Sequence, residues 1–153
     1  MKNLKRFLSI ALIVIACISF FLWSYQRRQV IGKQYLRINT TDVLVEVVKT
    51  DQDRSKGLGD RVTLDESTGM LFIFDEPKRW DFWMAGMRFG LDFIWIENNK
   101  VVDITENVQP PHKTDNNPVF VKPGTPVKYV LEVNEGWVKK NSIKVNDRVE
   151  FHL

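Results

Sequence analysis

Residues 91–104, LDFIWIENNKVVDI, decide the fold class of this chain. Two apolar runs of strand length lie on either side of Asn98 and Asn99. Asparagine tolerates the positive φ that a tight primed turn requires, so this pair between two such runs predicts a β-hairpin. The hairpin indicates that an antiparallel sheet forms the centre of the fold.

Further strands are predicted on both sides of this hairpin, because apolar residues alternate or form short runs there. The predicted strands cover residues 42–50, 69–74, 80–84, 127–133 and 143–151. Five prolines within 109–126 predict a long surface loop. The sequence therefore predicts a mainly β domain, a small antiparallel barrel or roll of six to eight strands.

Two short helices complete this prediction. Thr50 and Asp53 have capping-box spacing, and Gly57 follows, which predicts a helix over about 51–57. Asn134 can cap a second helix over 135–141.

An apolar segment precedes the domain. Residues 7–25 carry no charge, and a helix of about 19 residues just spans a hydrocarbon core of about 30 Å. The sequence thus predicts a basic flank (1–6), a single transmembrane anchor (7–25), a linker (26–34) and one β-rich domain (35–153). Basic residues before the anchor favour an extracytoplasmic domain at the cytoplasmic membrane. A cleaved signal peptide, or a lipid on Cys17, remains an alternative.

The charge of the domain argues against a nucleic-acid partner. The whole chain has a formal charge of +3. Six of its 22 basic residues and none of its 19 acidic residues lie within 1–34, so the remaining 16 basic and 19 acidic side chains give −3. Proteins that bind nucleic acid need Lys and Arg on the binding domain itself, to neutralise phosphates.

No motif of a metal, cofactor or nucleophile site is complete. The single cysteine, Cys17, lies in the apolar segment, and His112 and His152 are too far apart for a zinc-binding pair. A calcium-loop resemblance at Asp51 fails, because Lys56 and Val62 stand where glycine and glutamate are needed. The sequence predicts no metal, no cofactor and no catalytic residue, and its balance is against an enzyme.

The aromatic run from Trp80 to Trp95 is the most distinctive stretch. It can be packing in the core, which we favour, or the wall of an apolar ligand pocket. Asp92 lies within it and alternates with Ile94 onto an apolar face, where a carboxylate must be hydrogen-bonded or paired. We expect it to accept backbone N–H groups or to pair with Arg61 or Arg88.

Five motifs taken together resemble a known family. They are GL-x-x-R (57–61), GMLFIF (69–74), FWM (82–84), LDFIWI (91–96) and YVLEVNEG (129–136). In order and spacing they are similar to domain of unknown function 192, the uncharacterised ACR family. The resemblance covers residues 35–153 and implies a compact, mainly β domain of prokaryotes, often exported or membrane-tethered, with no established activity.

The resemblance also supplies candidate site residues. The chain departs from the family pattern at Gly59, at Ala85-Gly86-Met87 and at Gly90. The positions that still match are candidates for ligand binding, and they are Arg61, Trp83, Asp92, Glu132 and Asn134. By alternation with Lys128, Glu132 can equally be an exposed sheet charge.

The leading hypothesis for function is a non-catalytic module that binds a small molecule or a protein partner at the outer face of the membrane. A hydrolase that uses Asp92 and Glu132 as acid and base is an alternative, and it requires both carboxylates in one cleft. A structural subunit of a membrane complex is a further alternative.

Overall fold

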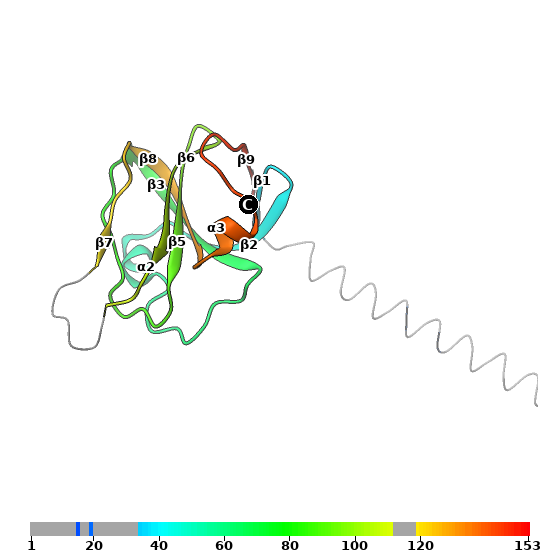
Figure 1. The fold of residues 1–153 in the computed structure, drawn as a ribbon, viewed down its shortest axis with the longest axis horizontal. Helices are drawn as coiled ribbons and strands as arrows, with labels where there is room; N and C mark the ends of the chain where they lie inside the picture. Colours follow the sequence, from blue (N-terminus) through cyan, green and yellow to red (C-terminus); the bar gives the residue numbers. More distant parts are fainter. Residues whose placement is uncertain (1–14, 16–18, 20–33, 112–118) are drawn as a thin grey trace, which may run out of the picture. The chain divides into compact units, whose positions relative to one another are not determined.

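The computed structural model describes Ile15, Ser19 and residues 34–111 and 119–153 (Figure 1). The chain divides into two units, residues 1–33 and 34–153. In the first unit the Ser19 hydroxyl donates to the Ile15 carbonyl at 2.8 Å. Apart from Ile15 and Ser19, the predicted anchor over 7–25 lies outside the described residues, and so do the alternatives for Cys17. Within the described residues, no helix is long and apolar enough to cross a bilayer.

The second unit is built on one curled sheet of seven strands. Its strands are β1 (Tyr35–Ile38), β2 (Thr41–Val48), β3 (Thr68–Lys78), β5 (Leu91–Glu97), β6 (Lys100–Val108), β8 (Val127–Asn134) and β9 (Val149–His152). Their order across the sheet is β6-β5-β8-β3-β2-β1-β9. β4 (Phe82–Trp83) and β7 (Phe120–Val121) form a separate two-stranded ribbon. The prediction of a mainly β domain is confirmed.

The central hairpin forms as predicted. β5 and β6 pair antiparallel, and Asn98 and Asn99 between them have φ values of 49° and 59°. Positive φ at both turn residues is what a type I′ turn needs, and its twist matches that of the flanking strands.

One pairing differs from the antiparallel prediction. β2 and β3 run parallel, with Val45 opposite Gly69 and Val47 opposite Leu71. A parallel pair needs a long crossover connection, and residues 49–67 supply it with helix α2 (Asp51–Lys56) inside. The capping prediction for α2 is confirmed, since the Asp53 amide donates to the Thr50 hydroxyl at 3.1 Å.

The inner face of the curled sheet encloses the first apolar core. All seven strands contribute to it, and helix α3 (Trp137–Lys140) adds Trp137 and Val138. The two edge strands of the sheet, β6 and β9, meet at one end. There the Val101 amide donates to the Asp147 carbonyl, and the backbones of Lys100 and Arg148 form an isolated antiparallel β-bridge. The sheet is therefore a half-barrel, and the contacts between the start of β6 and the segment before β9 close it on one side.

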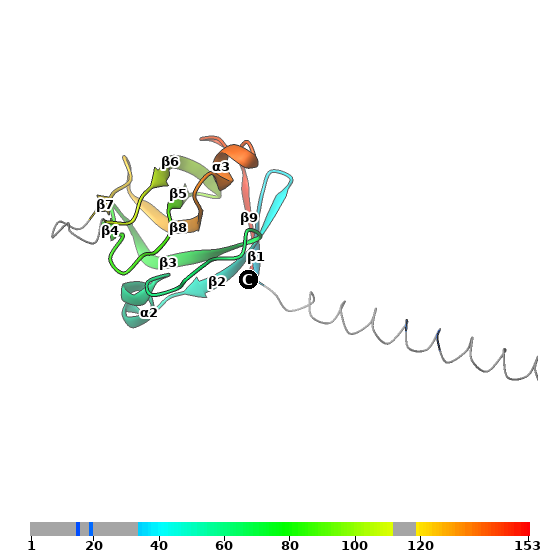
Figure 2. The same ribbon diagram turned by 60° about the horizontal axis from the view of Figure 1, so that its bottom comes forward.

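The outer face carries a second apolar core. Met70, Phe72, Phe93, Trp95 and Val130 project from β3, β5 and β8 into it. The segment after β3, with Phe82 and Met84, packs over these side chains. Figure 2 shows α2 and α3 on opposite sides of the sheet, so each helix borders a different core. The candidate site lies in a cavity on the side of the sheet that carries the second core.

The second helix is shorter than predicted and is not capped by Asn134. Gly136, with φ of 76°, precedes α3 and provides no side-chain cap. The Asn134 amide instead donates to the Leu64 carbonyl at 3.0 Å. The predicted loop over 109–126 contains β7, and its residues 112–118 lie outside the described part.

Candidate functional site

Glu132 is the centre of the candidate site. In β8 it lies opposite Met70 of β3 and Phe93 of β5, and Glu46 of β2 lies opposite Met70 in turn. Partners across a sheet project to the same face. Glu132 therefore stands in the middle of a row of side chains on the outer face of the sheet.

The Glu132 carboxyl is buried and has no partner among the described residues. The residue is 5% exposed, so the alternative of an exposed sheet charge is wrong. Desolvation raises the pKa of Glu132 to about 8, and no hydrogen bond or neighbouring charge in the described residues opposes this shift. No described buried side-chain oxygen is both enclosed and unpaired. The carboxyl oxygens must therefore reach open space, which is the cavity that Glu132 lines.

This cavity has a volume of about 470 Å³, and we call it the aromatic cavity. Glu132, Met87 and the backbone around Gly57 and Gly59 line part of it. The rest of the wall is formed by six aromatic rings, those of Phe72, Phe74, Trp80, Phe82, Trp83 and Phe120. Phe74 stacks on Trp80 with ring centroids 3.9 Å apart, and Phe72 meets Phe82 edge to face at 4.9 Å. These contacts fix the walls of the cavity before any ligand arrives.

The other charged groups that line the aromatic cavity are Asp51, Arg54, Lys56 and Asp81. Arg54 pairs with Asp51 at 2.6 Å and also donates to the carbonyls of Lys49 and Ile73. Asp81 pairs with Lys122 at 2.9 Å. Two of the three acidic side chains at the cavity are thus neutralised, and Glu132 is the one that is not.

Asp92 lies on the opposite face of the sheet from Glu132. It stands opposite Val133 of β8, so it points toward the inner core. Its two carboxylate oxygens accept the backbone N–H groups of Asn107 at 2.8 Å and Val138 at 3.0 Å. This structural role agrees with the backbone alternative expected from the sequence. The two carboxylates do not meet in one cleft, so the condition set for the hydrolase alternative is not met.

Trp83 and Arg61 lie on the same side of the sheet as Glu132. Trp83 is 52% exposed and stands beside Phe120 of β7, with ring centroids 6.4 Å apart, at the edge of the aromatic cavity. Arg61 forms an exposed ion pair with Glu46 at 2.7 Å and does not line the cavity. Trp83 is thus part of the site. Arg61 instead contacts Glu46, at the end of the row that contains Glu132.

The profile of the DUF192 family, described as "Uncharacterized ACR", matches residues 34–151. The chain belongs to this family. No curated protein gives a significant match to it.

Two solved structures resemble this DUF192 protein. One is a candidate transcription regulator of Sinorhizobium meliloti, with 30% identity, a TM-score of 0.70, and coverage of 78% of this chain and 94% of the other. The second, a protein of unknown function from Novosphingobium aromaticivorans, has 28% identity and a TM-score of 0.64, and the match covers 77% and 83% of the two chains.

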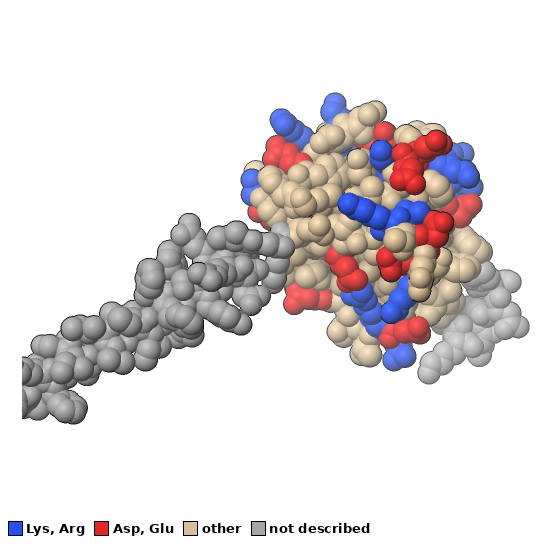
Figure 3. Space-filling view, turned by 180° about the vertical axis from the view of Figure 1, so that it is seen from behind, with Lys and Arg blue, Asp and Glu red and all other residues tan. Residues whose placement is uncertain are grey.

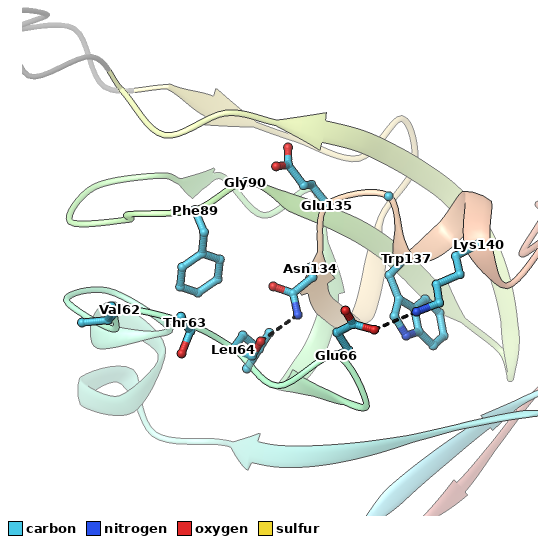
Figure 4. A pocket seen from close by; sticks show the side chains of 11 residues that line it. Val62, Thr63, Leu64, Glu66, Phe89, Gly90, Asn134, Glu135, Trp137 and Lys140 are labelled. Carbon is cyan, nitrogen blue, oxygen red and sulfur yellow. Dashed lines mark hydrogen bonds and ion pairs between the residues drawn. The ribbon is translucent and has the colours of Figure 1, made fainter.

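A second cavity of the DUF192 domain, about 420 Å³ in volume, contains Asn134 (Figure 4). Several of its polar groups have partners within the domain. Lys140 pairs with Glu66 at 2.7 Å, and the Asn134 amide donates to the carbonyls of Leu64 and Asp65. In Figure 4 the bond from Asn134 to Leu64 and the pair of Lys140 with Glu66 join β8 and α3 to the loop before β3. We therefore assign these groups to holding the loop in place.

Several residues of the aromatic cavity were not singled out from the sequence. Phe72, Phe74 and Phe120 lie on strands other than that of Trp83, and the backbone at Gly57 and Gly59 also lines the cavity. A signal was present in the alternation Met70, Phe72, Phe74, which marks one face of β3 as aromatic. The alternation does not indicate that the segment after β3 packs over that face.

Proposed function

We propose that this DUF192 domain is a non-catalytic binding module, that the aromatic cavity is its ligand site, and that residues 7–25 hold it at the outer face of the cytoplasmic membrane. One observation supports the site above all others, namely an unpaired and almost fully buried carboxyl at the wall of an aromatic space. A carboxyl that faces a cavity and whose pKa is raised by desolvation is a candidate functional group.

The size and lining of the aromatic cavity support a small organic ligand. Its volume of about 470 Å³ lies within the range of about 300–1,000 Å³ that is usual for ligand pockets. Its walls are apolar rings with a few polar groups among them, which is the common composition of such pockets.

Nucleic acid fits this domain less well. The Sinorhizobium relative is named as a candidate transcription regulator. In the present chain, however, residues 35–153 have a formal charge of −3. On the face shown in Figure 3, Lys and Arg side chains are interspersed with Asp and Glu. Phosphate binding needs a basic surface, so we favour a small molecule over nucleic acid.

The membrane part of the proposal rests on the uncharged run 7–25 and on the basic residues before it. A reporter enzyme that is active only outside the cytoplasm, fused after Leu153, tests the orientation. We expect activity from this fusion in intact cells, and the same signal from a reporter that is active only inside would contradict it.

A thermal-shift screen of the full chain in non-ionic detergent tests the binding function. The panel contains amines, aromatic compounds, sugars, peptidoglycan fragments, nucleotides and short peptides. A ligand at 100 times its Kd adds about 2.7 kcal/mol, which raises the Tm by several degrees. We expect at least one hit that the Trp83→Ala variant loses. A silent screen would contradict the proposal and favour a structural subunit of a membrane complex.

A further inference from the structure

We propose that the ligand of the aromatic cavity is a small organic cation, with its ammonium group beside the Glu132 carboxylate and its carbon substituents against the aromatic rings. The inference rests on the proposed function and adds the chemical class of the ligand to it. Three features of the cavity lead to this class.

The first feature is the missing partner of Glu132. The residue is 5% exposed, and within the described part of the chain its carboxyl has neither a hydrogen bond nor an ion pair. A buried carboxylate is tolerated when an opposite charge accompanies it. Because the described residues supply no such charge next to Glu132, a cationic ligand would complete the pair. An anionic ligand would instead meet this carboxyl without compensation.

The second feature is that the rings of this wall already bind cations of the protein. The Arg54 guanidinium lies over the Phe74 ring at 4.9 Å, and the Lys78 ammonium lies over the Trp80 ring at 5.4 Å. The face of an aromatic ring attracts a cation within about 6 Å, and quaternary ammonium groups are bound by aromatic cages in this way. The cavity offers further rings from Phe72, Phe82 and Phe120.

The third feature is the balance of the remaining charges at the cavity. Asp51 is paired with Arg54, and Asp81 is paired with Lys122. Lys56 lines the cavity from an exposed position, and Glu46 lies in the same row as Glu132 but pairs with Arg61. Glu132 is therefore the uncompensated acid at the cavity, although Lys56 reduces its attraction for a cation at the mouth.

A metal ion fits this site poorly because the site offers too few coordinating groups. Among the described residues, no group of three His, Cys, Asp or Glu side chains could hold a metal. Hard cations require about six oxygen ligands, whereas the surroundings of Glu132 are aromatic. An organic cation needs one counter-charge and apolar walls, and the cavity has both.

The experiment compares two probes of nearly equal shape. Benzyltrimethylammonium carries a permanent charge, and neopentylbenzene is its neutral counterpart. Each is titrated into the full chain in non-ionic detergent, and binding is followed by calorimetry and tryptophan fluorescence. We expect the cation to bind at least tenfold more tightly than the neutral probe at pH 9.

The matched variants are Glu132→Gln at the cavity and Glu106→Gln on the exposed part of β6 as the control. We expect E132Q to weaken the cation at least tenfold and to leave the neutral probe unchanged, while E106Q binds both as the wild type does. Trp83→Leu is a second test at an exposed position, and we expect it to weaken the cation more than the neutral probe.

The pH dependence adds an independent readout. Because the pKa of Glu132 is raised to about 8, binding of the cation releases a proton below that pH. Affinity should rise about tenfold per pH unit from pH 6 to about pH 8. The groups Asp51, Arg54, Lys56 and Asp81 also face the cavity, and the same titration of E132Q measures their share.

Different failures have different meanings. If both probes bind equally and E132Q changes neither affinity, the ligand class is wrong and the binding function stands. If neither probe binds at millimolar concentration, the ligand class and the aromatic cavity as the binding site are both overturned.

Discussion

The pH dependence of folding provides a direct test of the burial of Glu132. Glutamine has nearly the same shape as glutamate and does not titrate, so Glu132→Gln keeps the packing of the row between Met70 and Phe93. The variant therefore removes the titration of this one carboxyl and leaves the packing around it nearly unchanged. The free energy of unfolding is the quantity to follow, as a function of pH.

The magnitude follows from the pKa of Glu132, which is about 8 in the folded domain against an ordinary value of 4.5. Between these values the folded state binds a proton that the unfolded state has lost, so stability falls as pH rises through this window. The whole difference corresponds to about 5 kcal/mol, and about 3 kcal/mol of it is lost by pH 7. Relaxation of the cavity and entry of water make these values upper limits.

The assay is urea unfolding of the full chain in non-ionic detergent from pH 5 to pH 9, with circular dichroism of the β-rich domain as the signal. We expect the free energy of unfolding of E132Q, relative to wild type, to increase by several kcal/mol across this range. The control variant E106Q carries the same change on an exposed part of β6, away from the cavity, and measures the effect of removing an acid there.

A clear result can refute this reasoning. If the stability curves of wild type and E132Q run parallel from pH 5 to pH 9, Glu132 titrates as an ordinary exposed glutamate. The carboxyl would then not be desolvated in the folded domain, and the argument for a missing partner would lose its basis.

Three further predictions concern other parts of the domain. Asp92→Asn should lower stability by about 3 kcal/mol in urea unfolding, because an amide has one acceptor oxygen for the two N–H groups of Asn107 and Val138; an unchanged midpoint would refute this. Gly69→Ala should cost about 1–3 kcal/mol, since its Cβ would lie 2.6 Å from the Glu132 carbonyl oxygen, and an unaltered Tm would contradict that contact. Trp83→Ala should change stability by less than about 1 kcal/mol, because the ring is 52% exposed, and should still reduce ligand affinity by calorimetry.

The sequence predicted the local features of the fold well. The turn at Asn98 and Asn99 and the cap at Thr50 were found at the predicted residues. Both depend on contacts within a few residues of the chain, so their signals are local. The cap assigned to Asn134 was wrong, because its amide reaches Leu64, 70 residues away in sequence.

The candidate site could be predicted only in part. Trp83 and Glu132 were singled out and do line one cavity. Asp92 was singled out with them, yet it points to the opposite face of the sheet. Its position depends on the register between β5 and β8, and a shift of one residue exchanges the two faces. That register is a property of the assembled sheet.

By itself, the sequence determined the turn at Asn98 and Asn99, the capped helix α2 and the central strands, because apolar spacing, asparagine turns and capping groups act over a few residues. The short strands β1 and β7 were not predicted. Only the tertiary structure decided that β2 and β3 run parallel and that the aromatic segment after β3 covers the outer face of β8. That cover, brought from about 50 residues away, turns Glu132 from an exposed sheet charge into a buried and unpaired carboxyl. Burial depends on what packs over a residue, and alternation along one strand does not contain that information.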